Sequence, residues 1–139
     1  ERWAATEGRI DAIVDGSGGM LLVDVATHEC DLLAALGRPR STTPETEQAA
    51  RLALGLLVPG IESAGLGPLA VDLGTVRFAS HPGPPSCVIH TDAWEALRAI
   101  ESRRTADELL ALAHDGDLAP YLAVIDDHSP LPTASLGER

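Results

Sequence analysis

The stretch TPETEQAARLALGLLV, residues 43–58, decides the fold that we predict for this chain. Thr43 followed by Pro44 is a strong helix start, because a hydroxyl side chain caps a helix and proline suits its first position. Glutamates follow in the first turn, where the helix dipole favours carboxylates. The alanines and leucines after them make the segment apolar nearly all round. The sequence therefore predicts a buried central helix that ends at Pro59.

Short apolar runs on both sides of this helix predict a sheet of about five strands. Glycines at positions 16, 18 and 19 favour a hairpin turn between the first two strands, because glycine readily adopts the positive φ of such turns. The predicted strands are residues 9–14, 20–26, 69–79 (as one strand or as a hairpin about Gly74), 86–90 and 121–125.

Three further helices are predicted from their start signals. A short helix fits residues 29–36. Asp92 caps a second helix, and the capping box Thr105-x-x-Glu108 opens a third that ends near Gly116. Together with the strands, these helices predict an α+β fold, a single domain with helices packed on a sheet of about five mixed or antiparallel strands.

The length of 139 residues is that of one domain with a core of its own. We expect this acidic α+β domain to occupy residues 1–126. Residues 127–139 hold two prolines and little to bury, so we expect a loosely ordered C-terminal tail. The chain opens at Glu1 without a methionine, which fits a processed protein or part of a longer one.

The charge balance limits the partners of the chain. Ten basic residues face 21 acidic ones, which gives a formal net charge of −11. Such a surface repels phosphate backbones, so we expect no nucleic acid and no anionic membrane as a partner. No stretch approaches the ~20 apolar residues of a membrane span. A basic protein partner, or a divalent cation, suits this charge.

Lysine and asparagine are absent, and this excludes several mechanisms. The chain has no lysine for a Schiff base or for a phosphate loop, and it has no N-glycosylation site. A GC-rich bacterial genome explains the absence, since the codons of both residues are rich in A. The two cysteines are too few for a disulfide framework, so we expect a reducing, cytoplasmic setting.

Two short motifs, His28-x-Cys30 and Cys87-x-x-His90, hold both cysteines of the chain. Two thiolates and two imidazoles are a ligand set for tetrahedral Zn²⁺, so these four residues form a candidate zinc site. The predicted elements weaken the pairing, because residues two apart on a helix or three apart on a strand point in different directions. Two buried cysteines with unrelated histidines are the simpler interpretation, and a Cys30–Cys87 disulfide is a third.

Acidic residues at the ends of apolar runs form a second candidate site. In open sheets, ligands bind beyond the carboxyl ends of strands, where carboxylates can converge on Mg²⁺ or a substrate. The residues of interest are Asp24 and the pair Asp126-Asp127, with His128 as a possible base. The simpler interpretation is that aspartates cap turns and helices after strands.

The residues support two functions of different classes. The leading hypothesis is a non-catalytic acidic protein-interaction module, of a regulatory, adaptor or immunity type, that needs no cofactor and binds a basic protein. Its warrant is the absence of an intact catalytic constellation together with the acidity of the chain. The alternative is a metal-dependent hydrolase that uses either the His/Cys zinc site or the carboxylate site.

Overall fold

The helix predicted from Thr43 lies at the centre of the molecule. The computed structural model describes residues 2–40 and 42–138, with side chains from residue 18 onward. In α2 (Pro44–Leu56), the backbone N–H of Thr46 donates to the Thr43 hydroxyl at 3.3 Å, which is the expected N-cap. This helix contacts α1 (Arg2–Ala35), α4 (Ala93–Ile100) and β2 (Arg77–Ala79). Its buried side chains are Thr46, Ala49, Ala50, Ala53 and Leu54.

The sheet that the structure describes is mixed and has four strands in the order β2-β1-β3-β4. β1 (Leu69–Asp72) pairs antiparallel with β2 and parallel with β3 (Cys87–His90). The edge strand β4 (Ala113–Gly116) pairs antiparallel with β3. Three successive residues are buried at the start of both β1 and β3. Since successive side chains point to opposite faces, both faces of these central strands are covered.

Two more helices, α4 and α5 (Ala106–Leu110), begin where their capping residues predict. The Asp92 carboxylate accepts the Glu95 N–H at 2.8 Å at the start of α4. Both hydrogen bonds of the predicted capping box, between Thr105 and Glu108, are present at the start of α5. The bounds of the other helices are α3 (Val58–Ser63) and α6 (Ala119–His128).

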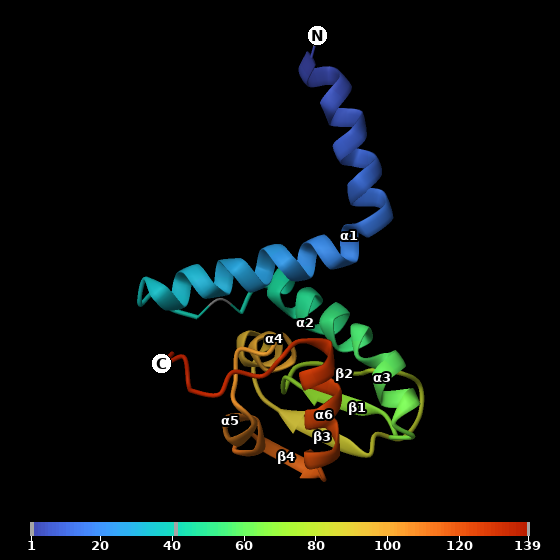
Figure 1. The fold of residues 1–139 in the computed structure, drawn as a ribbon, viewed down its shortest axis with the longest axis vertical. Coiled ribbons are helices and arrows are strands. Elements are labelled where there is room, and N and C mark those ends of the chain that lie inside the picture. The colour runs from blue at the N-terminus through green and yellow to red at the C-terminus, as the bar shows by residue number, and fades with distance from the viewer. Residues whose placement is uncertain (1, 41, 139) are drawn as a thin grey trace.

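The long helix α1 is the least expected element. Figure 1 shows it changing direction part-way along: its N-terminal part leads away from the rest of the chain, and its second part lies across α2 and α4. Residues 16–19 hold three glycines and a serine, a composition at which helices bend. The predicted hairpin turn at these residues is therefore wrong.

The two strands predicted in this region are also wrong, because residues 9–14 and 20–26 both lie in α1. Val23, Ala26 and Cys30 are buried at spacings of three and four residues, which is the period of a helix. Contact of this face with α2 and α4 outweighs the strand propensity of the apolar run. The helix predicted over residues 29–36 is the C-terminal end of α1.

Three predictions in the rest of the chain need correction. The last predicted strand, residues 121–125, lies in α6, where Tyr121, Val124 and Ile125 are buried at helical spacing. The helix from Thr105 ends at Leu110, and the residues before Gly116 form β4. The central helix ends at Leu56, and the separate helix α3 continues through Pro59.

The chain is one α+β domain, as predicted, and the mixed sheet has one strand fewer than the five expected. α6 extends to His128, and the residues after it run past α5 to α4, where Glu138 meets Arg98. No helix in the described part of the chain has both the length and the apolar content needed to cross a lipid bilayer.

Candidate functional site

The first pair of predicted zinc ligands diverges on α1. The Cys30 side chain is buried against the body, whereas the His28 ring is exposed. The two ring nitrogens of His28 lie 3.4 Å from carboxylate oxygens of Asp24 and Asp31. Burial raises the pKa of the Cys30 thiol to about 11, so at neutral pH it is a poor metal ligand and a poor nucleophile.

The second pair diverges on β3. Cys87 is buried at the start of the strand, and burial raises the pKa of its thiol. His90 lies at the other end and is partly exposed. Both cysteines are free thiols. In the part of the chain that the structure describes, no three residues of the His, Cys, Asp and Glu types lie close enough together to hold a metal ion.

His90 instead lies between two aspartates that the sheet brings to it. Parallel pairing places Asp72 of β1 opposite His90, and Asp115 comes from the antiparallel neighbour β4. His90 Nε2 lies 3.0 Å from Asp115 Oδ2, and Nδ1 lies 3.8 Å from Asp72 Oδ2. Hydrogen bonds from the Gly74 backbone and from Arg77 lower the pKa of the Asp72 carboxyl. Asp115 therefore engages one ring nitrogen of His90, and the other faces Asp72 beyond hydrogen-bond distance.

The predicted carboxylate site is not assembled either. Asp24 lies on α1, and Asp126 and Asp127 are neighbours on α6 that face different hollows. Asp126 accepts the Leu131 N–H at 2.8 Å, so it holds the chain after α6. His128 Nε2 lies 3.7 Å from Oε1 of Glu101, whose pKa is raised by burial. These contacts link elements of the fold and leave no common point for a cation.

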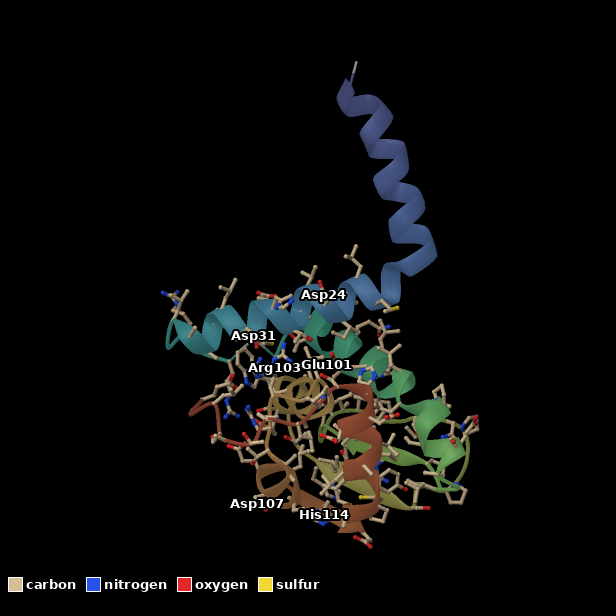
Figure 2. The ribbon with its side chains drawn as sticks, viewed as in Figure 1. Asp24, Asp31, Glu101, Arg103, Asp107 and His114 are labelled. Atoms are coloured by element: carbon tan, nitrogen blue, oxygen red, sulfur yellow. The ribbon has the colours of Figure 1, made fainter. Side chains whose placement is uncertain are left out.

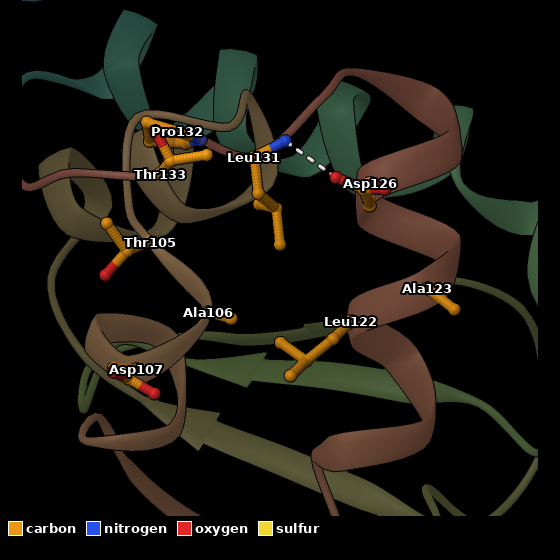
Figure 3. Close-up of a pocket in the computed structure, with 9 residues that line it drawn as sticks. All are labelled: Thr105, Ala106, Asp107, Leu122, Ala123, Asp126, Leu131, Pro132 and Thr133. Carbon is orange, nitrogen blue, oxygen red and sulfur yellow. Dashed lines mark hydrogen bonds between the residues drawn. The ribbon is translucent and has the colours of Figure 1, made fainter.

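A groove of about 560 Å³ lies between α5, α6 and residues 131–133 (Figure 3). Its walls are largely apolar, and Asp107 and Asp126 lie at its margins. The Thr105 hydroxyl caps α5, and no lining residue is a histidine or a cysteine. The groove therefore offers two carboxylates and two hydroxyls, but no imidazole and no thiol. Its lining residues are Thr105, Ala106, Asp107, Leu122, Ala123, Asp126, Leu131, Pro132 and Thr133.

The strongest candidate for a functional surface is the outer side of α1. Four of its large apolar side chains fall within about 60° of the helix circumference, given about 100° per residue. We call these four the outer stripe: Leu21, Val25, Leu32 and Leu36, which are 40%, 56%, 64% and 72% exposed. Met20 is also exposed but lies about 100° around the helix from Leu21, outside the stripe. Exposed large apolar side chains gathered on one side of a helix indicate a binding surface.

The opposite side of the same helix is filled. Val23, Ala26, Thr27 and Cys30 are buried there, about half a turn from the outer stripe. Figure 2 shows Asp31 on the side of α1 that faces Arg103 and the rest of the chain, with other side chains of α1 on the side turned away from it. α1 is therefore apolar on two opposite sides, and the fold buries only one of them.

Negative charge borders the outer stripe. Asp24 and Glu29 lie at its two margins, and both are exposed. Residues 18–36 contain three acidic residues, Asp24, Glu29 and Asp31, and no lysine or arginine. The exposed His28 lies within the stripe between Val25 and Leu32. The surface is therefore an apolar row with acidic borders.

Comparison of the chain with protein-family models, with curated proteins and with solved structures gives no match. The candidate surface thus follows from this chain alone. It includes two of the residues predicted from the sequence, Asp24 and His28, but in another role. The sequence does contain a signal for this surface, namely the four- and seven-residue spacing from Leu21 to Leu36. The prediction of a strand over residues 20–26 obscured that spacing.

Proposed function

We propose that this chain is a non-catalytic protein-interaction module that binds a basic, amphipathic helix along the outer stripe of α1. The observation that carries the proposal is the exposure of Leu21, Val25, Leu32 and Leu36 in one row on a helix whose opposite side is buried. Such a row, at spacings of four and seven residues, is the surface that a partner helix recognises.

The energy available from this surface indicates what the partner must add. Burying a large aliphatic side chain contributes about 1.5–3 kcal/mol, and these side chains are already partly covered, so each would add about 1 kcal/mol. Association itself costs at least about 4 kcal/mol in lost translational and rotational freedom. The outer stripe alone would therefore give weak binding, and charge contacts at its margins would make it specific.

The charge of the stripe's borders selects the kind of partner. Asp24 and Glu29 favour a helix with arginine or lysine beside its apolar row. A second copy of this chain would bring the same acidic borders and would be repelled. The free, buried thiols of Cys30 and Cys87 are compatible with a reducing, cytoplasmic setting. A regulatory, adaptor or immunity-type role fits a module of this kind.

The proposal is tested with two designed helical peptides of equal length. Both carry leucines at the spacing of the outer stripe, one with arginines beside them and one with glutamates. We expect the arginine peptide to bind the wild-type chain. The Leu32→Glu variant should bind the same peptide at least about tenfold more weakly, which is a loss of about 1.4 kcal/mol in binding free energy. Fluorescence anisotropy measures both affinities.

The matched control is Leu110→Glu, which places the same charge at another half-exposed leucine, on α5. It should bind the arginine peptide about as well as the wild type does, because it adds the same charge as Leu32→Glu but leaves the outer stripe intact. Equal affinity of the Leu32→Glu and Leu110→Glu variants would refute the proposal. Self-association of the wild type that Leu32→Glu abolishes would mean that a second copy is the partner. The metal-dependent alternative stays a prediction, which elemental analysis of protein purified without chelator tests.

A further inference from the structure

Two arginine side chains lie almost completely buried between α4 and the end of the chain. The side chain of Arg98, on α4, is 1% exposed, and that of Arg104 is 9% exposed. The guanidinium carbon of Arg98 lies 5.8 Å from the centre of the Trp94 ring. Buried guanidinium groups need carboxylate partners, because an unpaired buried charge is strongly unfavourable.

Glu138 supplies a partner to both arginines. Arg98 donates from Nε to Glu138 Oε2 at 2.9 Å and from Nη2 to Glu138 Oε1. Arg104 donates from Nη1 to Glu138 Oε2 at 2.8 Å. One carboxylate therefore accepts three hydrogen bonds, two of them from the parallel N–H groups of a single guanidinium, which is the strong bidentate geometry.

The charges around this carboxylate balance only while it is present. Arg98 also pairs with Asp31 at 2.5 Å, and Arg104 pairs with Glu95 at 2.5 Å. Three guanidinium groups and three carboxylates surround this point: Arg98, Arg103 and Arg104, with Asp31, Glu95 and Glu138. The more exposed Arg40 lies at the edge, 3.6 Å from Glu95 and 3.8 Å from Asp92, and this further pair leaves the balance unchanged. Without Glu138 the cluster would keep an excess positive charge in a buried place, and another anion would be favoured there.

Besides Glu138, three hydrogen bonds hold the segment that carries it: Ser102 donates to the Ser129 carbonyl, the Leu131 N–H donates to Asp126, and the Ser135 hydroxyl donates to Glu108. Leu131 also packs against the core, so Glu138 matters most for the end of the segment beyond Ser135. Residues 129–138 form no helix or strand, and most of them are exposed. Leu136, the apolar residue nearest Glu138, is 52% exposed. A hollow of about 230 Å³ separates this end of the segment from Ala34 and Ala35 of α1. Because little apolar surface is buried, the Glu138 carboxylate is the main attachment of this end.

We propose that Arg98 and Arg104 form a carboxylate-binding site for the glutamate of an acidic peptide, and that Glu138 occupies this site as an intramolecular ligand. The peptide replaces residues 129–138 and places its glutamate on the same three donors. The site is on the other side of α1 from the outer stripe, so this inference is independent of the proposed function. The net charge of −11 repels an acidic peptide at long range, so the binding is measured with added salt, which screens that repulsion.

The test uses the full chain and a fluorescent peptide, SPLPTASLGE, which copies residues 129–138 and is amidated at its C-terminus so that the glutamate side chain is its one carboxylate. The Glu138→Gln variant keeps its own segment but loses the charge, so its site is open to the peptide. We expect this variant to bind the peptide at least about tenfold more tightly than the wild type does, because the wild type's own segment competes at high effective concentration. A peptide with glutamine in the last position should bind the variant at least about tenfold more weakly.

The matched control is Glu62→Gln, which removes an exposed carboxylate on α3, away from both proposed surfaces, and should bind the peptide as weakly as the wild type. Equal binding of the glutamate and glutamine peptides, or no binding of either, would overturn the proposal. If the Glu138→Gln variant does not fold, the wild type is titrated with the glutamate peptide. The amide signal of Gly137 should then shift toward its position in a free peptide, and no shift at saturation would also overturn the proposal.

Discussion

Asp31 shows how much one carboxylate on α1 contributes to the fold. It accepts hydrogen bonds from Arg98 at 2.5 Å and from Arg103 at 3.1 and 3.2 Å, so it ties α1 to α4 and the turn after it. Burial alone would raise the pKa of this carboxyl. The hydrogen bonds and charges of the two arginines outweigh burial and lower the pKa from 3.8 to about 2.

We predict that Asp31→Asn lowers the free energy of unfolding by about 1–2 kcal/mol at neutral pH, allowing for the partial exposure of the pair. A folded-state pKa below the unfolded value stabilises the fold above the unfolded pKa, and the contribution disappears as the pH falls through the folded pKa. The difference between the variant and the wild type should therefore shrink between pH 3.8 and about 2.

Urea unfolding of both proteins across this pH range measures that difference. Glu29→Gln, an exposed change on the same helix, is the control and should alter stability little at any pH. A penalty for Asp31→Asn that stays constant down to pH 2 would mean that the packing of the side chain, and not its charge, supports α1.

The two thiols give a second prediction at this scale. Burial raises the pKa of Cys30 to about 11 and also raises the pKa of Cys87. Since the thiolate is the reactive form, we expect both to react with a disulfide reagent at least about a hundredfold more slowly than free cysteine. The reagent releases a coloured thiol when it reacts, and the rate of that release, in native protein and in denaturant, measures the reactivity of both cysteines. Fast reaction of one thiol in the native protein would contradict the burial and would restore that cysteine as a candidate nucleophile.

At the scale of elements, the close approach of β4 to β3 depends on Gly116. It adopts φ +83°, and a Cβ on it would lie 2.2 Å from the Ser86 carbonyl oxygen. Gly74, in the turn between β1 and β2, has the same φ of +83° but open space around it. The two glycines therefore separate the cost of backbone strain from the cost of a steric clash.

We predict that Gly74→Ala destabilises the protein by about 1 kcal/mol, the cost of the strained backbone alone. Gly116→Ala should cost at least about 3 kcal/mol, because the backbone of β3 must also move. Chemical denaturation of both variants measures the difference. Equal losses would mean that β4 can shift without loss of pairing, and that it contributes little to the stability of the sheet.

The elements that could be predicted are those whose signal is local. Thr43, Asp92 and the pair Thr105 and Glu108 cap their helices through bonds within a few residues. Gly74 lies in the turn between β1 and β2, which is the second of the two alternatives predicted for residues 69–79. β4 could not be predicted, since Ala113–Gly116 has no apolar pattern and is a strand only because β3 pairs with it. α1 depends on contacts with α2 and α4, which lie far along the chain.

The candidate sites follow the same division. The sequence identified acidic and thiol residues by type, but a metal site requires convergence, which only tertiary structure determines. His28 and Cys30 point to different sides of α1, and Asp126 and Asp127 face different hollows. The arginine cluster was missed because its partners, Asp31, Arg98 and Glu138, are as much as 107 positions apart (138 − 31) and no motif joins them.

At the scale of the whole molecule, salt should act on two kinds of charge differently. The net charge of −11 makes the folded chain repel itself, and ions screen this repulsion. Ion pairs such as Arg51–Glu47 are exposed, so screening weakens them, but each contributes at most about 1 kcal/mol. The cluster around Arg98 is buried and is screened much less. The repulsion should therefore decide the sign of the salt effect.

We predict that sodium chloride stabilises the protein. Raising the ionic strength from about 0.01 M to about 0.15 M shortens the screening length from about 30 Å to about 8 Å. The stability should rise by on the order of 1 kcal/mol, or about 4 °C in Tm, and differential scanning calorimetry measures this. Choline chloride at equal ionic strength should have the same effect, because screening does not depend on the identity of the cation. A stabilisation by sodium chloride alone would indicate a specific cation site. A fall in Tm with either salt would mean that the ion pairs of Glu138 and Asp31 are open to solvent and outweigh the repulsion.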